Sequence, residues 1–242
     1  MADSAASSPE GAGVPAPPTF VRARTPEQKE QRRAAILGVA RGLVEERGIL
    51  GLTLADLADE VGLATSNVVR HFGTREEIFV ALVAQDGIEV TREVVAALDG
   101  VPRPGGSATP QDVARVVMDT VLARTVFCEL LGHLPTHLEH NVSLETATRL
   151  KEATATLVTD LGDAVRRACP PLTADGATLF VLAVVSMVSA VATGRRPAPV
   201  VRQVYAHRPD LEVFAGDPFG QVEELLAATL RGLLASPASE KG

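Results

Sequence analysis

Two short helical patterns separated by a glycine, in residues 53–72, constrain the fold of this chain more than any other feature. Thr53 begins the first helix as an N-cap residue, and Gly62 ends it because glycine readily adopts the positive φ of a tight turn. Ala58 is small enough for a second helix to cross the first one closely, and Val68 on that second helix would pack back against it. This spacing predicts a helix-turn-helix motif.

A capped helix is expected on each side of the motif. Thr25 is an N-cap candidate for a helix that ends at Gly48. Thr74 and Glu77 form a further capping box, which opens a longer helix that extends to about Leu98. The motif and its flanking helices together predict a small helical domain.

The remainder of the chain also follows a helical period. Its apolar residues recur at helical spacing, and no stretch alternates convincingly with period two. The Pro- and Gly-rich residues 99–109 and the long segment 194–216 are expected to be loops, and the chain must kink or break around Pro135. The predicted fold class is therefore all-α.

The charge of the chain is unevenly distributed. A net charge of −7, taken alone, argues against nucleic-acid binding, for which a basic domain is usual. Residues 65–75, however, contain two arginines, one histidine and no acid. A small positive patch on an acidic body suits a protein that touches DNA at one place and is repelled elsewhere.

Several features indicate where such a chain would reside. Cys128 and Cys169 lie far apart in the sequence, which disfavours a disulfide framework or a cysteine zinc site and favours a reducing cytosol. The N-terminus lacks the basic and apolar regions of a secretory signal. The longest apolar stretch, residues 179–191, is shorter than the roughly 20 residues of a membrane span. We predict a cytoplasmic location and no membrane partner, and we interpret the apolar stretch as a buried or interface helix.

The second helix of the motif presents a set of polar side chains away from the predicted core. The set comprises short polar groups together with an amide, a guanidinium and an imidazole. Groups of these kinds form hydrogen bonds with the base edges and phosphates of double-stranded DNA. Asn67 is able to read adenine and Arg70 guanine, although phosphate contact is equally open to both, and a merely solvated face is the alternative. The candidate contact residues on this helix are Thr65, Ser66, Asn67, Arg70 and His71.

The stretch around this motif resembles the TetR (tetracycline-repressor) family over about residues 28–85. The matching text is RRAAILGVARGLVEERGILGLTLADLADEVGLATSNVVRHFGTREEIFVALV. The resemblance implies that residues 65–70 are the recognition helix and that Thr53, His71 and Arg75 contact phosphates. Two positions depart from the family pattern: Ala64 replaces the usual serine, and Val69 replaces an aromatic residue, so two hydroxyl groups are lost.

The resemblance also assigns roles to the rest of the chain. It implies a helical bundle that encloses a ligand pocket and dimerises through its last two helices, here Ala174–Thr193 and Pro218–Ala235; burial within one subunit is the alternative for these helices. The expected parts are a disordered arm (1–24), a helix-turn-helix DNA-binding domain (25–88), a ligand-binding and dimerisation domain (89–236) and a disordered tail (237–242). The arm ends in Arg22 and Arg24, which either reach the DNA or are simply solvated.

The ligand-binding residues are expected on the central helices of this bundle. The candidates are Met118, Phe127, His133, His137 and Met187, with ordinary core packing as the alternative for the apolar ones. His133, His137 and His140 also have a spacing compatible with a metal, but Pro135 disturbs their alignment. We therefore predict no metal and no cofactor, and interpret these histidines as a pocket rim or exposed surface.

These observations favour a ligand-responsive repressor that binds a palindromic operator as a homodimer. An activator, or a sensor module with degenerate DNA binding, is the alternative. An enzyme is disfavoured because the sequence contains no G-x-S-x-G elbow, no P-loop and no dinucleotide-binding glycine motif.

Overall fold

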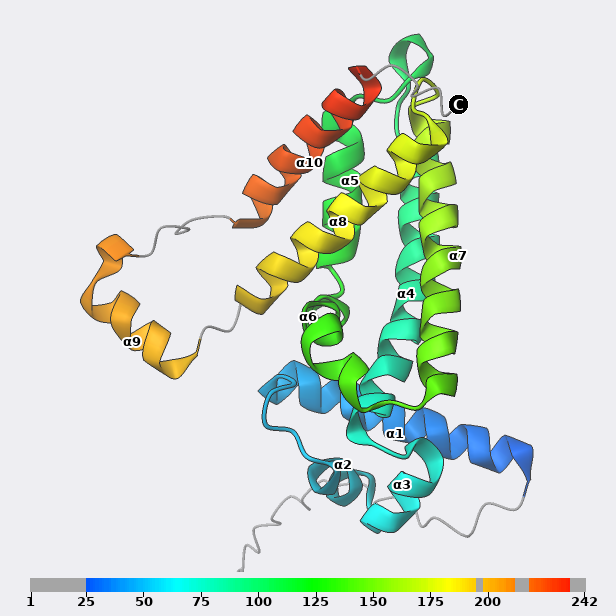
Figure 1. Ribbon diagram of the computed structural model, residues 1–242, viewed down its shortest axis with the longest axis vertical. Helices are drawn as coiled ribbons and strands as arrows, with labels where there is room; N and C mark the ends of the chain where they lie inside the picture. The colour runs from blue at the N-terminus through cyan, green and yellow to red at the C-terminus, as the bar shows by residue number, and fades with distance from the viewer. Residues whose placement is uncertain (1–24, 195–197, 212–217, 236–242) are drawn as a thin grey trace, which may run out of the picture.

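A computed structural model describes residues 25–194, 198–211 and 218–235, which form helices and no strands (Figure 1). The all-α prediction is thereby confirmed. The arm with Arg22 and Arg24 and the tail 237–242 lie outside the described residues. The α-helices are α1 (Pro26–Arg47), α2 (Leu54–Val61), α3 (Thr65–Phe72), α4 (Arg75–Asp99), α5 (Pro110–Leu122), α6 (Thr125–His133), α7 (Leu144–Ala168), α8 (Ala174–Gly194), α9 (Pro199–His207) and α10 (Pro218–Ala235).

The first three helices begin and end where the local sequence signals predict. Thr25 and Thr53 each form a complete capping box, in which the threonine side chain accepts a backbone N–H of the first turn while its own N–H is accepted in return. Gly62 has φ 73°, a left-handed conformation that side chains with a Cβ rarely adopt. The turn between α2 and α3 is therefore set by local chemistry.

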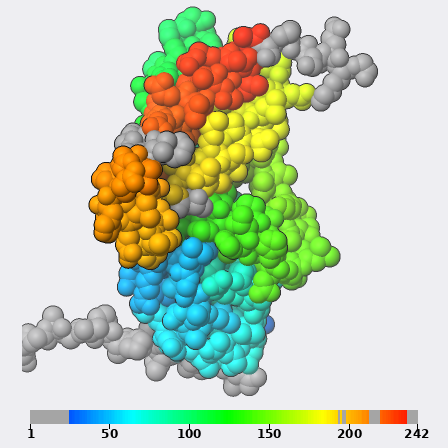
Figure 2. Space-filling model, turned by 60° about the vertical axis from the view of Figure 1, so that its left-hand side comes forward, coloured from blue at the N-terminus to red at the C-terminus, as the bar shows by residue number. Residues whose placement is uncertain are grey.

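Helix α4 connects the small N-terminal group of helices to the larger bundle. It packs on α1 and α3 at its start and on α5, α6 and α7 along the rest of its length, with α7 running beside it (Figure 1). Helix α8 packs against α6, α7 and α10, and Figure 2 shows α8 and α10 side by side on one face. A movement of α4 would therefore involve both parts of the molecule.

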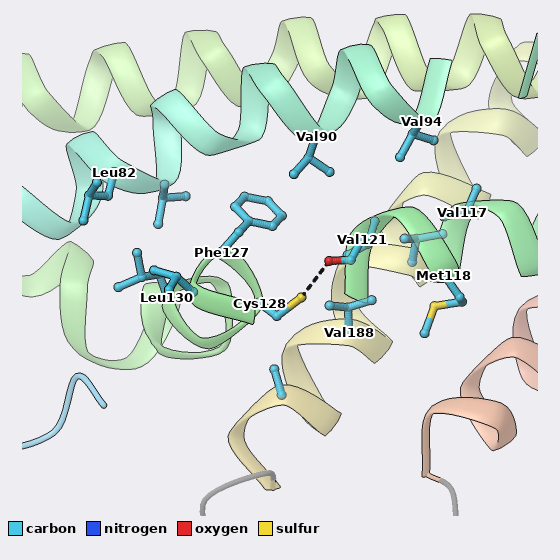
Figure 3. Close-up of a cluster of buried hydrophobic side chains, with 14 of the residues drawn as sticks. Leu82, Val90, Val94, Val117, Met118, Val121, Phe127, Cys128, Leu130 and Val188 are labelled. Carbon is cyan, nitrogen blue, oxygen red and sulfur yellow. Dashed lines mark hydrogen bonds between the residues drawn. The ribbon is translucent and has the colours of Figure 1, made fainter. Parts of the chain in front are cut away.

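The interior of the bundle is filled by apolar side chains (Figure 3). Val90 of α4, Val121 of α5 and Phe127 of α6 meet there, and all three are buried. The thiol of Cys128 points into the same cluster and donates a hydrogen bond to the carbonyl of Val121, 3.2 Å away. Close packing of this kind leaves the bundle core without a preformed cavity of ligand size among the side chains in the close-up.

Three expectations are corrected by tertiary structure. At the start of α4, Thr74 caps the helix, but the Glu77 carboxylate does not complete the capping box and accepts the backbone N–H of Ser143 at 2.8 Å instead. The segment 194–216, expected to be a loop, contains α9 and a short 3-10 turn at Pro209–Leu211. Leu144, expected on the apolar face of its helix, is exposed.

The break expected at Pro135 is present. Helix α6 ends at His133, and the chain continues through one π turn, Leu134–Leu138, and one 3-10 turn, Glu139–Asn141. Proline disrupts the regular α-helical hydrogen-bond ladder, which explains the change of helix type at this point.

Helix α8 (Ala174–Gly194) is longer than the apolar stretch of residues 179–191 that it contains. Within the described residues it is the one helix long and apolar enough to cross a membrane by length and composition, and 33% of that window is buried. A core or interface helix of a folded domain passes the same test. The packing of one side of α8 on three other helices fits the buried or interface interpretation.

A buried ion pair fixes α1 to α4. The Asp86 carboxylate is 2% exposed, and both of its oxygens accept hydrogen bonds from the guanidinium of Arg41. Hydrogen bonding to Asp86 raises the pKa of Arg41, so the guanidinium stays charged. The pair is stabilising only while both partners are present, because a lone buried carboxylate is poorly solvated.

Removing the cation of this pair is expected to destabilise the protein. Arg41→Met should lower the free energy of unfolding by about 2–4 kcal/mol, since Asp86 is left buried without a cation, and a second change, Asp86→Leu, should restore most of the loss. Urea denaturation at fixed protein concentration measures both effects. Arg149→Met, which breaks an exposed pair with Glu145, is the control and should change stability by less than about 0.5 kcal/mol. Equal effects of Arg41→Met and Arg149→Met would contradict this account.

Candidate nucleic-acid interface

Helix α3 has a packed face and an open face. On the packed face, Val68 is fully buried and Phe72 nearly so, against the small Ala58 of α2, itself fully buried. Ala58 is small, which allows α2 and α3 to approach closely, as its place in the motif predicts. The open face is consequently held in a fixed orientation by the packing of the other face.

The predicted contact residues of α3 lie on or beside this open face. Thr65, Ser66 and Arg70 are exposed, and Asn67 and His71 are half-buried. The face therefore brings together hydroxyl, amide and guanidinium groups, all able to bond base edges or phosphate oxygens.

The first turn of α3 has no side-chain cap. Ala64 occupies the N-cap position and makes no side-chain hydrogen bond, whereas serine or threonine there would accept a backbone N–H of the first turn. The Asn67 N–H is accepted by the Ala64 carbonyl at 2.8 Å, so the N–H groups before it, those of Thr65 and Ser66, are the ones left to water or a bound phosphate.

An arginine of α1 holds the other end of α3. The Arg33 guanidinium donates a hydrogen bond to the carbonyl of His71 at 3.1 Å and stacks over the ring of Phe72, 4.0 Å from its centroid. A cation at a helix C-terminus stabilises the unpaired carbonyls there. Sequence reasoning missed this role, and the only signal was the adjacent pair Arg32 and Arg33 on the helix that precedes the motif.

The side chains around His71 form a cluster of positive charge, the basic cluster. Burial lowers the pKa of His71 below its ordinary value, and the neighbouring cations act in the same direction. The imidazole is thus predominantly neutral near pH 7 in the free protein. The cations of the basic cluster are Lys29, Arg32 and Arg33 of α1 and Arg70 of α3.

Two predicted phosphate contacts are engaged within the protein. The Thr53 hydroxyl accepts the backbone N–H of Asp56 at 3.1 Å and donates to the Asp56 carboxylate at 2.5 Å, although Thr53 itself is exposed. The Arg75 guanidinium is half-buried and binds both the carbonyl of Leu52 and the carboxylate of Glu76. A phosphate contact by either side chain competes with these bonds.

Arg75 also lines a pocket between the two parts of the molecule. The cavity has a volume of about 180 Å³ and is bounded by the turn after α1, by the start of α4 and by the π turn after α6. His133 and His137 both line it, with ring centroids 5.5 Å apart. Burial lowers the pKa of His133, and the neighbouring His137 lowers it further. The lining residues are Ile49, Leu50, Gly51, Arg75, His133, His137 and Leu138.

The other candidate ligand residues lie elsewhere. Met118 and Phe127 are buried in the core of the bundle, and Met187 is partly buried at its edge. The pocket residues and these three are therefore not brought together. In the described part of the chain, no three His, Cys, Asp or Glu side chains are grouped so as to hold a metal, and His140 is exposed.

Four hydrogen bonds join the pocket region and its surroundings to the DNA-binding end, one of them from the Asn141 side-chain amide to the Glu76 carboxylate at 3.1 Å. The Glu129 carboxylate of α6 accepts the backbone N–H of Ile49 at 2.8 Å. The Thr74 hydroxyl donates to the carbonyl of Asn141 at 2.8 Å, beside the bond from the Ser143 N–H to Glu77. These bonds link the turn after α1 and the start of α4 to the segment that connects α6 with α7.

Helices α8 and α10 lie on one face of the bundle (Figure 2), and each exposes large apolar side chains. Leu179 and Leu182 of α8 are 53% and 58% exposed, and Leu225 of α10 is 55% exposed. Small residues, Ser186 and Ala228, lie on the same sides of these helices and are exposed as well. Leucines around small residues form a surface on which another helix pair can pack closely.

Family models match nearly all of the described chain. The model of bacterial regulatory proteins of the tetR family matches residues 36–82, and the tetracyclin repressor-like C-terminal domain matches residues 84–237. An HTH-type transcriptional repressor of Mycobacterium tuberculosis strain H37Rv is 33% identical over 75 residues, and an HTH-type regulator of Mycobacterium bovis matches equally. That segment covers 31% of this chain and 40% of those relatives.

Solved structures share the fold. The multidrug binding protein EbrR has a TM-score of 0.55 and 19% identity, covering 86% of this chain and 97% of its own. A putative transcriptional regulator from Rhodococcus sp. RHA1 has a TM-score of 0.56 and 16% identity, covering 85% and 95%. The helix-turn-helix, the helical C-terminal domain and both family models agree. The chain belongs to the TetR family of bacterial transcriptional regulators.

Proposed function

We propose that this regulator binds a palindromic DNA operator as a homodimer and acts as a repressor in the cytoplasm. The observation that carries the proposal is the open face of α3, where Ser66, Asn67 and Arg70 stand beside the basic cluster. Residues 25–88 serve as the DNA-binding domain, and residues 89–236 bind the ligand and dimerise. Repression, rather than activation, is supported by the matching Mycobacterium tuberculosis repressor.

The dimer follows from the size of the recognition element. One helix of eight residues covers only a few base pairs, so a specific site requires two half-sites read by two subunits. The exposed leucines of α8 and α10 supply a surface for association. Because both helices belong to the bundle, the two α3 helices remain free to face one DNA duplex.

The ligand response is proposed to use the pocket between the two parts of the molecule. A molecule bound between His133 and the turn at Leu50 would press on contacts made by Glu129 and Ile49. Such a ligand changes DNA affinity only if it binds one arrangement of these contacts better than the other. Met118, Phe127 and Met187 define the alternative, a site within the bundle that opens when ligand enters.

DNA binding is tested first with genomic fragments of the source organism, recovered on the protein and sequenced at low and moderate salt. We expect enrichment of a palindromic motif that survives moderate salt, because base contacts add to the salt-sensitive phosphate contacts. Arg70→Ala with His71→Ala should weaken operator binding about 100-fold, measured by fluorescence anisotropy, while circular dichroism and dimer mass are unchanged.

A matched control for that experiment is Arg166→Ala, which removes an exposed arginine in the last turn of α7, where it pairs with Asp163, and should leave operator affinity unchanged. Fragments that show no motif and dissociate at moderate salt would favour the alternative of a sensor with degenerate DNA binding. The missing cap at Ala64 is the observation that keeps this alternative open.

The dimer surface is tested by placing charge on it. Leu182→Glu with Leu225→Glu should convert the dimer to monomer in analytical ultracentrifugation and weaken operator binding at least about 100-fold, since two linked half-sites become independent. Leu144→Glu is the control, because Leu144 is 83% exposed at the start of α7 and away from α8 and α10. A dimer that survives the double change would place the interface elsewhere.

The ligand site is tested by screening metabolite pools for release of the operator. A compound that releases the wild-type protein should lose at least about tenfold in potency on His133→Ala with His137→Ala, since both imidazoles line the pocket and loss of a hydrogen-bonded group typically weakens binding by that much. Operator affinity without the compound should be unchanged. Met187→Ala is the comparison variant, and loss of potency in it alone would move the site into the bundle.

A further inference from the structure

The open face of α3 carries one large apolar side chain among polar ones. Val69 is 43% exposed, and the other exposed residues of this helix are Thr65, Ser66 and Arg70. Thr65 and Val69 are one turn apart, and so are Ser66 and Arg70, so the four residues form two neighbouring rows on the exposed side of α3. Val69 therefore lies on the side of α3 that would contact a bound DNA duplex.

The fold does not require an apolar residue at this position. The packing of α3 is carried by Val68, fully buried, and by Phe72, which is 3% exposed. Val69 lies between these two in sequence but on the other side of the helix. A single exposed apolar residue needs no explanation by itself. Val69, however, lies on the face of α3 that is proposed to enter the major groove, where an apolar side chain has a partner.

The major groove offers one apolar group to such a side chain. Thymine carries a 5-methyl group there, while the other base edges present hydrogen-bond donors and acceptors. Valine suits this contact because its branched side chain has few rotamers in a helix and loses little freedom on binding. It also has no polar atom that would lose a hydrogen bond to water.

We propose that Val69 contacts the 5-methyl group of a thymine in each half-site and thereby selects thymine at that position of the operator. The proposal rests on the proposed function, in which α3 enters the major groove. Arg70 and Asn67 then supply hydrogen bonds beside it, and the basic cluster holds the phosphates. The position of Val69 also explains how the chain tolerates the loss of a hydroxyl there, since an apolar contact replaces a polar one.

The test uses the operator recovered from the genomic fragments. Each thymine of a half-site is replaced by deoxyuridine, symmetrically in both half-sites, which removes the methyl group and leaves every hydrogen-bonding edge unchanged. Anisotropy at fixed salt gives Kd for the wild-type protein, for Val69→Ala and for Val204→Ala. Val204 is the matched control, because it is also a valine and is 42% exposed, but it lies on α9, away from the proposed DNA and ligand sites.

The wild-type protein and Val204→Ala should lose about 15-fold in affinity at one thymine position, about fourfold for each half-site methyl removed. Val69→Ala should bind the thymine operator weaker by a similar factor and be insensitive to deoxyuridine at that position. Val69→Thr, which keeps one methyl group and the branched shape, should retain part of the sensitivity. It provides the same measurement if the alanine variant is poorly folded.

Two results would overturn the inference. In the first, the wild-type protein binds a specific operator, but its affinity does not change when any thymine methyl group is removed. The proposed DNA binding then remains valid, whereas the proposed contact of Val69 with thymine does not. In the second, Val69→Ala keeps the full deoxyuridine effect, which assigns the methyl contact to another side chain. A protein that binds all sequences equally overturns both this inference and the proposed operator function.

Discussion

The buried pair of Arg41 and Asp86 determines how the two parts of this regulator are joined. Helix α4 packs on α1 and α3 at one end and on α5, α6 and α7 along the bundle, and Asp86 lies within the stretch of α4 that faces α1. Because Asp86 is a carboxylate removed from water, α1 is held at the position where Arg41 reaches it with both of its amino groups. The orientation of α3, which rests on α1 and α2, follows from that attachment.

Because the ion pair fixes α1 to α4, relative movement of the two parts of the molecule is expected at the junction beside it. The turn after α1 is bonded to α6 through Ile49 and Glu129, and the start of α4 is bonded through Thr74 to the segment after α6. These hydrogen bonds are part-buried or exposed, and each is worth about 1–3 kcal/mol, so opening them costs less than opening the packed core. A pocket placed among them is therefore better able to influence α3 than a cavity of equal volume within the filled bundle. This physical contrast supports the junction as the place where a ligand acts.

How far the sequence predicts this structure depends on the range of the interactions involved. The helix starts at Thr25 and Thr53 and the turn at Gly62 follow from chemistry within a few residues, and their prediction was correct in detail. Glu77 has the local pattern of a capping residue but bonds Ser143, which is distant in sequence. Helix α9 was missed because the glycines and prolines around it signal a loop more strongly than its short apolar pattern signals a helix. Helical periodicity predicts which residues of α3 lie away from the core, whereas the role of Arg33 requires knowledge of which helix end it reaches.

The distribution of charge favours binding of DNA at the basic cluster. The chain as a whole is acidic, with a net charge of −7, while the basic cluster gathers cations of α1 and α3 around one imidazole. Burial and those cations lower the pKa of His71, so positive charge there is already dense enough to disfavour another proton. A phosphate placed in the cluster relieves this repulsion, whereas the same phosphate against the acidic body is repelled. The electrostatic term thus orients α3 toward the duplex without regard to sequence, and discrimination between sequences is left to the few side chains that reach the bases.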